Sequence, residues 1–98
     1  MAVSSAVHHL LEKAAAMLPA SDEELICKGI AAGVSERILE LKRAQSRLQK
    51  AYGSLEALEQ DIKATGVPPH DHTLYTDLLE WRAIHHELAQ LLHLLETL

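Results

Sequence analysis

Apolar residues recur at spacings of three, four or seven over two long stretches of the chain, 34–62 and 74–98. Such spacing places apolar side chains along one face of an α-helix. The break between them, Gly66-Val67-Pro68-Pro69, does not continue a helix. Since a short loop makes consecutive helices antiparallel neighbours, the pattern predicts a long antiparallel helical hairpin. The apolar rows are Val34, Ile38, Leu41, Leu48, Tyr52, Leu55 and Ile62, and Leu74, Leu78, Trp81, His85, Leu88, Leu92 and Leu95.

Folding the chain about the Pro-Pro loop predicts one register for this hairpin. The register pairs apolar residues with apolar residues, as the inward positions of packed helices require: Ile62 with Leu74, Leu55 with Trp81, Leu48 with Leu88 and Leu41 with Leu95. It also brings together two pairs of opposite charge, Glu56 with Arg82 and Lys42 with Glu96, and it places His85 opposite Tyr52. A slip of one residue would spoil both patterns.

A shorter helix, about residues 4–18, precedes the hairpin and ends before Pro19. A helix of about four turns is marginal on its own in water, so this one must dock. We expect it to fold back beside residues 22–38 and to cover the Leu-rich end, 91–98. The predicted architecture is a single all-α domain over residues 1–98, a hairpin whose open end is closed like a three-helix bundle.

The second helix, about residues 22–65, begins at Ser21, whose side chain suits the cap position. It contains Gly29 and Gly33. Because each glycine costs about 1 kcal/mol in a helix interior, we expect a kink or break near residues 29–34. The alternative is a continuous helix whose glycines allow close approach. The third helix covers about residues 72–98.

The predicted hairpin leaves its loop end with two helices and no third element to cover them. Apolar and hairpin-facing residues near this end therefore form a candidate partner-binding surface: Ala51, Tyr52, Leu58, Leu79, Ile84 and His85. A surface of this kind indicates a small interaction module, an adaptor or assembly subunit. Its partner would be another protein or a second copy of the chain.

Composition and charge exclude several classes of protein and partner. Of the 98 residues, 48% are apolar, which excludes a disordered chain. A net charge of −5 argues against nucleic acid or an anionic membrane as the partner. No apolar run approaches 18 residues, so no membrane span is expected. A single cysteine, Cys27, and the lack of a signal-peptide pattern in this sequence favour a reducing, cytoplasmic location.

Basic residues gather in one part of the second helix, where five of the nine fall within fourteen positions: Arg37, Lys42, Arg43, Arg47 and Lys50. We interpret this run as a solvated face balanced by Glu36 and Glu40. The alternative is an electrostatic dock for an acidic partner. The segment from Gly29 to Leu39 also resembles the turn of a helix-turn-helix, which implies a DNA-binding regulator as another alternative. The acidic chain favours a simple helix–helix corner there.

Seven histidines raise the question of a metal site. The string His85-His86-Glu87 resembles the HHE string of hemerythrin-like di-iron bundles. Such sites need inward His and carboxylate ligands from several helices, and only Glu59 is available on the others. We therefore expect no metal and no cofactor. No nucleophile stands near a base in the sequence, so we expect no enzymatic activity.

One further resemblance concerns the layout of the hairpin and the ending Leu95-Glu96-Thr97-Leu98. Both are similar to the small helical-hairpin co-chaperones of type III secretion, although the extra N-terminal helix departs from that class. The resemblance implies an alternative role in holding another secretion subunit soluble.

Overall fold

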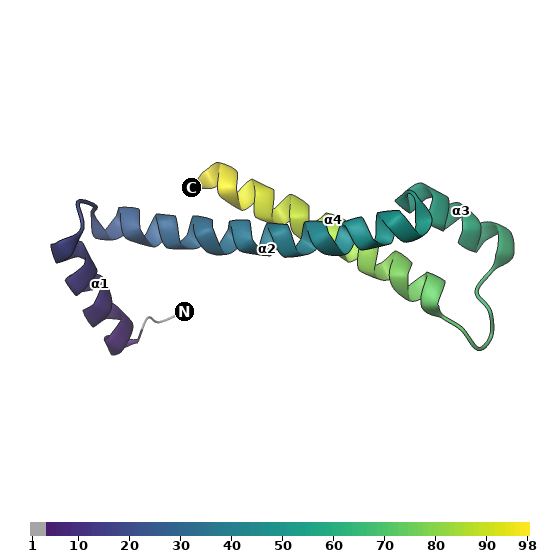
Figure 1. Cartoon of the computed structure of the whole chain (residues 1–98), viewed down its shortest axis with the longest axis horizontal. Coiled ribbons are helices and arrows are strands. Elements are labelled where there is room, and N and C mark those ends of the chain that lie inside the picture. The colour runs from purple at the N-terminus through teal and green to yellow at the C-terminus, as the bar shows by residue number, and fades with distance from the viewer. Residues whose placement is uncertain (1–3) are drawn as a thin grey trace.

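The computed structural model describes residues 4–98, and the regular structure of this part consists of four helices without strands. The helices are α1 (Ser5–Met17), α2 (Asp22–Tyr52), α3 (Leu55–Thr65) and α4 (Thr73–Thr97). They form an elongated molecule of 62 × 24 × 19 Å, in which α2 and α4 run antiparallel (Figure 1). The all-α prediction is confirmed.

Serine side chains begin the first three helices. The hydroxyl oxygens of Ser4, Ser21 and Ser54 each accept a hydrogen bond from the backbone N–H three residues later. These bonds satisfy backbone donors that a helix start leaves without an intrahelical partner. Before α4, the Asp71 carboxylate accepts from the backbone N–H of Thr73 at 2.9 Å. Each helix start therefore has a local chemical cause.

The break in the second helix is not where the glycines of residues 29–34 suggested. Helix α2 continues through Gly29 and Gly33, so the predicted break there is wrong. The chain turns instead at Gly53, whose φ of 87° and ψ of −62° are a conformation that L side chains rarely adopt. Ser54 then starts α3. Packing of α2 against α1 and α4 outweighs the modest propensity cost of the two helical glycines.

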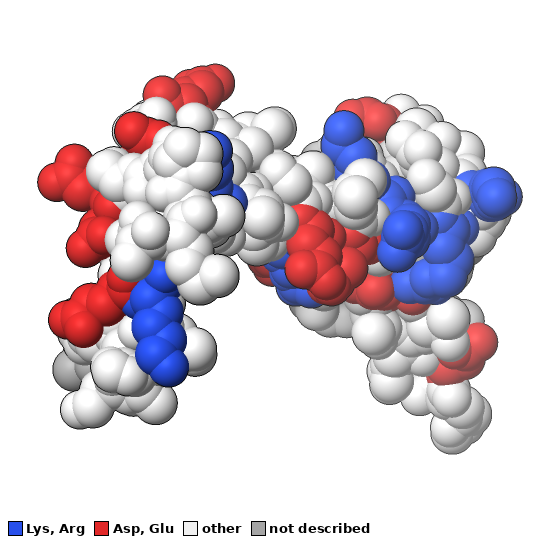
Figure 2. Space-filling model, turned by 60° about the vertical axis from the view of Figure 1, so that its left-hand side comes forward, with Lys and Arg blue, Asp and Glu red and all other residues white. Residues whose placement is uncertain are grey.

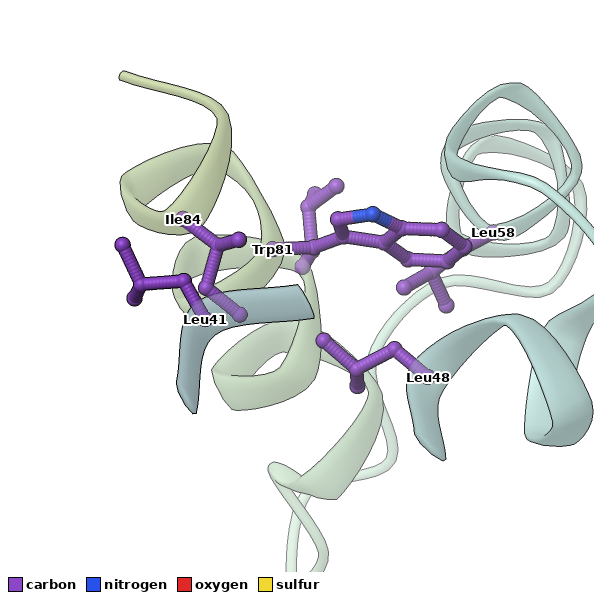
Figure 3. Packing of buried hydrophobic residues seen from close by; sticks show 6 residues of the cluster. Leu41, Leu48, Leu58, Trp81 and Ile84 are labelled. Carbon is purple, nitrogen blue, oxygen red and sulfur yellow. The ribbon is translucent and has the colours of Figure 1, made fainter. Parts of the chain in front are cut away.

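After the break at Gly53, α3 continues past the end of α2 at an offset and packs against both α4 and α2 (Figure 1). The hydrophobic core lies there and consists of Leu41, Leu48, Leu58, Leu78, Trp81 and Ile84. In Figure 3 the Trp81 indole extends from α4 toward Leu58, with Leu48 beside it. These three side chains are almost completely buried. The expectation that two helices stand alone at the loop end is therefore wrong, because α3 is the third.

Polar contacts between α2 and α4 show that the predicted register is displaced by about two helical turns. Tyr52 bonds to Asp77 rather than lying opposite His85. On α3, Glu59 rather than Glu56 pairs with Arg82. A slip of seven residues keeps apolar positions facing one another, so apolar matching alone does not detect it. The slip arises because residues 53–72 form a separate helix and loop, which lets α4 begin level with the end of α2.

Helix α1 is placed differently from the prediction. It packs against α2, and within the described residues it makes no contact with α4. Figure 1 shows α1 leaving the start of α2 at a steep angle, while the C-terminal end of α4 lies on the other side of α2. The three-helix closure predicted for the open end is therefore wrong. We call this end the terminal end and define it as residues 4–33 and residues 91–98.

Candidate interaction site

The six residues predicted to bind a partner do not share one environment. Leu58 and Ile84 belong to the core, with 0% and 4% of their surfaces exposed, so they are not available to a partner of the folded chain. Tyr52 is half-buried. The other three, Ala51, Leu79 and His85, are exposed. Leu58 enters the core as part of α3, and Ile84 enters it from α4, so neither contributes to the surface that the sequence had suggested.

Tyr52 ties the end of α2 to the start of α4. Its hydroxyl donates to the Asp77 carboxylate at 2.5 Å. This hydrogen bond, aided by burial of the ring, raises the pKa of Tyr52 to about 12, because losing the proton would place two negative charges together. The pair is thus a structural contact at the loop end.

His85 lies close to the core without joining it. Its Nε2 is 3.3 Å from the side-chain nitrogen of Gln45, and its ring meets Trp81 edge-to-face at 6.4 Å. Among residues 4–98, no three His, Cys, Asp or Glu side chains come together in a way that could hold a metal ion. None of the described helices has the length and apolar character to cross a membrane.

The five basic residues of α2 between positions 37 and 50 have two kinds of environment. Arg37 pairs with Glu40 and Glu87, and its guanidinium holds the pKa of Glu87 below its usual value. The other four basic residues line a shallow hollow of about 530 Å³, together with Leu39 and Ser46: Lys42, Arg43, Arg47 and Lys50. Arg47 already contacts both carboxylate oxygens of Glu80. Because α2 does not turn at residues 29–34, the segment lacks the corner of a helix-turn-helix.

Exposed apolar side chains concentrate at the terminal end. Of the twelve large exposed apolar residues in the described chain, nine lie there: Val7, Leu10, Met17, Leu18, Ile26, Ile30, Leu92, Leu94 and Leu98. No described residue of α1 is fully buried. In Figure 2 the end that carries α1 shows white surface between charged residues, with basic side chains across it and acidic side chains toward its margin. Most of the exposed apolar surface thus lies at the end opposite to the predicted one, although Leu79 of the predicted set is also exposed.

Helices α1 and α2 enclose an apolar groove of about 440 Å³ at this end. Its lining comes from both helices: Val7, His8, Leu11, Leu25, Ile26, Gly29 and Ile30. A Cβ placed on Gly29 would meet no atom within 4 Å, which shows that the space beside it is open. We call this feature the α1/α2 groove.

The last two turns of α4 form the second apolar feature, which we call the α4 tail (residues 91–98). Leu91 and Leu95 are half-buried, whereas Leu92, Leu94 and Leu98 are 41–48% exposed. The sequence predicted that the Leu-rich end, residues 91–98, would be covered by another helix. It missed the groove, whose signal is the pair Ile26 and Ile30 on a part of α2 that precedes the regular apolar row.

Comparison with known proteins gives the family without a function. The whole chain, residues 1–98, matches the Uncharacterized protein MJ0235 family, and the chain belongs to that family. No curated protein matches it, and no solved structure does.

Proposed function

We propose that the chain is a protein–protein interaction module, an adaptor or assembly subunit, that binds through the apolar surface of its terminal end. The observation that carries this proposal is the α1/α2 groove with Ile26 and Ile30 48% and 42% exposed in it. Apolar patches of this kind on a folded chain are typical of protein-binding surfaces. Holding another subunit soluble, as the co-chaperone resemblance implies, is one form of the same function.

The state of α1 supports the proposal. This helix has 13 residues and contacts α2 alone among the described helices. Isolated helices of that length are marginal in water, and most helical stability in proteins comes from packing of an apolar face. A partner seated in the α1/α2 groove would contact α1 and α2 together, so binding would also stabilise α1.

The experiment compares three immobilised baits in an extract of cells that make the protein: wild type, Ile30→Lys and Leu79→Lys. Ile30 lines the groove, and Leu79 is a matched control, since it is exposed to a similar extent near the loop end. We expect mass spectrometry to find a protein captured by wild type and Leu79→Lys but reduced at least tenfold with Ile30→Lys. Capture that survives Ile30→Lys, or that only Leu79→Lys abolishes, would contradict the proposed surface.

A further inference from the structure

We propose that the partner is a second copy of this chain: two copies pack antiparallel at their terminal ends, and the α4 tail of each occupies the α1/α2 groove of the other. This inference rests on the proposed function and names its partner. It joins the two uncovered apolar features of the chain, a groove and a leucine-rich helix end.

The two features fit each other in kind but do not meet within one chain. The α1/α2 groove has an almost wholly apolar lining. The α4 tail presents Leu92, Leu94 and Leu98 to solvent. However, α1 and the α4 tail lie on different sides of α2, and within the described residues α1 and α4 make no contact. A tail can therefore fill a groove only if it comes from another chain.

A twofold axis satisfies both features with one partner. In an isologous dimer the same contact occurs twice, because each chain contributes one groove and one tail. The assembly is then closed, and both apolar features are covered in both chains. A foreign helix placed in the groove would leave the α4 tail exposed.

The exposed surface area supports an extensive interface. The chain exposes 7345 Å², about 1,800 Å² more than the roughly 5,500 Å² expected of a compact protein of its mass. A standard interface takes about 800 Å² from each partner, and obligate dimers take more. The radius of gyration, 20.1 Å, likewise exceeds the 12–13 Å or so of a compact domain of this length. The excess area is enough to supply a stable dimer interface.

The distribution of charge along α2 favours the antiparallel orientation. Residues 22–36 carry four acidic side chains and one lysine, Asp22, Glu23, Glu24, Glu36 and Lys28. Residues 37–50 carry five basic side chains and one acid, Glu40. Arg37 and Arg47 already pair with Glu87 and Glu80 within the chain. The other three basic residues, Lys42, Arg43 and Lys50, supply the positive charge that an antiparallel partner brings toward the acidic start of the other α2, whereas a parallel partner aligns like charges. Complementary potentials of this kind select orientation and partner.

The first measurement is the mass of the purified full-length chain by light scattering after size-exclusion chromatography. We expect twice the 10.8 kDa of the chain for wild type and for the control Leu79→Lys. We expect monomers for Ile30→Lys in the groove and for Leu94→Glu in the tail, each with a dissociation constant raised at least a hundredfold. Circular dichroism checks that both variants keep their helices, which is expected because both side chains are 41–42% exposed.

Mixing the two monomeric variants tests the groove–tail pairing itself. In a mixed dimer, one groove–tail contact is entirely wild type, and the other joins the introduced lysine of one chain to the introduced glutamate of its partner. We therefore expect an equimolar mixture of Ile30→Lys and Leu94→Glu to form dimers at a concentration where each alone is monomeric. If grooves met grooves and tails met tails, every contact would contain a substituted side chain and the mixture would stay monomeric.

The results of these experiments can overturn the dimer without overturning the proposed function. A wild type that is still monomeric at about 100 μM, where a complex with a micromolar dissociation constant is largely formed, would overturn the dimer. The proposed function would survive that result if the Ile30→Lys bait still lost a captured protein. A dimer that Leu79→Lys dissociates, but Ile30→Lys does not, would overturn both. A mixture that remains monomeric would overturn the groove–tail exchange.

Discussion

The two ends of this molecule contain the same kinds of apolar residue, but these are buried at the loop end and exposed at the terminal end. At the loop end, the apolar core side chains from three helices are 0–5% exposed. At the terminal end, nine large apolar side chains from three segments are 41–83% exposed, with Met17 the most exposed. The difference arises from the helix that joins the α2–α4 pair at each end, α3 at the loop end and α1 at the terminal end. After Gly53, α3 packs against both α4 and α2, whereas α1 contacts α2 alone among the described helices.

The difference in burial between the two ends determines which of them stabilises a single chain. Complete burial of a leucine side chain contributes about 1.5–3 kcal/mol relative to exposure. Leu48 and Leu58 make that contribution within the chain, since both are fully buried. Leu10 and Leu92 do not, since they are 65% and 48% exposed. The loop end therefore stabilises the monomer, and the terminal end holds apolar area that only a partner can cover.

The largest expected effect comes from a matched pair of leucine substitutions, one at each end. Leu58→Ala should lower the free energy of unfolding by about 2–5 kcal/mol, because it removes fully buried atoms and leaves a cavity. Leu10→Ala should change the same quantity by about 0.5 kcal/mol or less, since its side chain is mostly in solvent. Urea unfolding followed by circular dichroism measures both. Low protein concentration keeps association out of the comparison.

Equal losses at the two positions would show that the two ends contribute alike to the stability of the single chain. A large loss for Leu10→Ala in the monomer would mean that α1 packs within its own chain as tightly as α3 does. A negligible loss for Leu58→Ala would mean that α3 does not form the core described for the loop end.

The helices themselves follow from the sequence, because their causes are local. The cap at Ser21, the proline at position 19 and the apolar spacing after Val34 act within a few residues. The first and last helices accordingly lie within one residue of the ranges expected at each end. The break at Gly53 was not predicted, because two helical glycines, Gly29 and Gly33, carry a larger helix-propensity cost than one. Helix propensity does not include the packing of the helix faces against neighbouring helices.

The register and the site depend on longer-range geometry, and sequence patterns determine neither. Leu48 and Trp81 are both buried in the core, whereas Leu88, the predicted partner of Leu48, is partly buried against it, and either pairing matches apolar with apolar. The candidate surface lies at the terminal end because of the directions of two turns. The local sequence pattern does not determine those directions. After the turn at Gly53, α3 packs on α2 and α4 and places Leu58 in the core, and after the turn that precedes α2, α1 and α4 do not meet within the described part of the chain.

An intermediate effect is expected from two glycine-to-alanine changes that report on the position of the helix break. Gly53→Ala should cost about 1–3 kcal/mol, because its positive φ strains any L side chain. Gly33→Ala should stabilise the chain by about 0.5–1 kcal/mol, because α2 is helical there and an added Cβ meets no atom within 4 Å. Thermal and urea unfolding give both values. The opposite pair of signs would place the break near residue 33 and return α3 to a continuous second helix.

The smallest effect is a pH dependence confined to the loop end, from the bond between Tyr52 and Asp77. Folding raises the pKa of Tyr52 from 10.0 to about 12. The proton is therefore held more tightly in the folded chain, so this contribution to stability is complete below pH 10 and declines as the pH rises toward 12. Between these pH values, the free energy of unfolding should fall more steeply for wild type than for Tyr52→Phe.

Urea titrations of wild type and Tyr52→Phe from about pH 8 to about pH 12 measure this difference in slope. Tyr75→Phe is the control, since it removes the hydroxyl of an exposed tyrosine. Parallel profiles for wild type and Tyr52→Phe would show that the bond does not hold α2 to α4. The contrast of the loop end with the terminal end would then rest on the burial of leucine and tryptophan side chains and not on this bond.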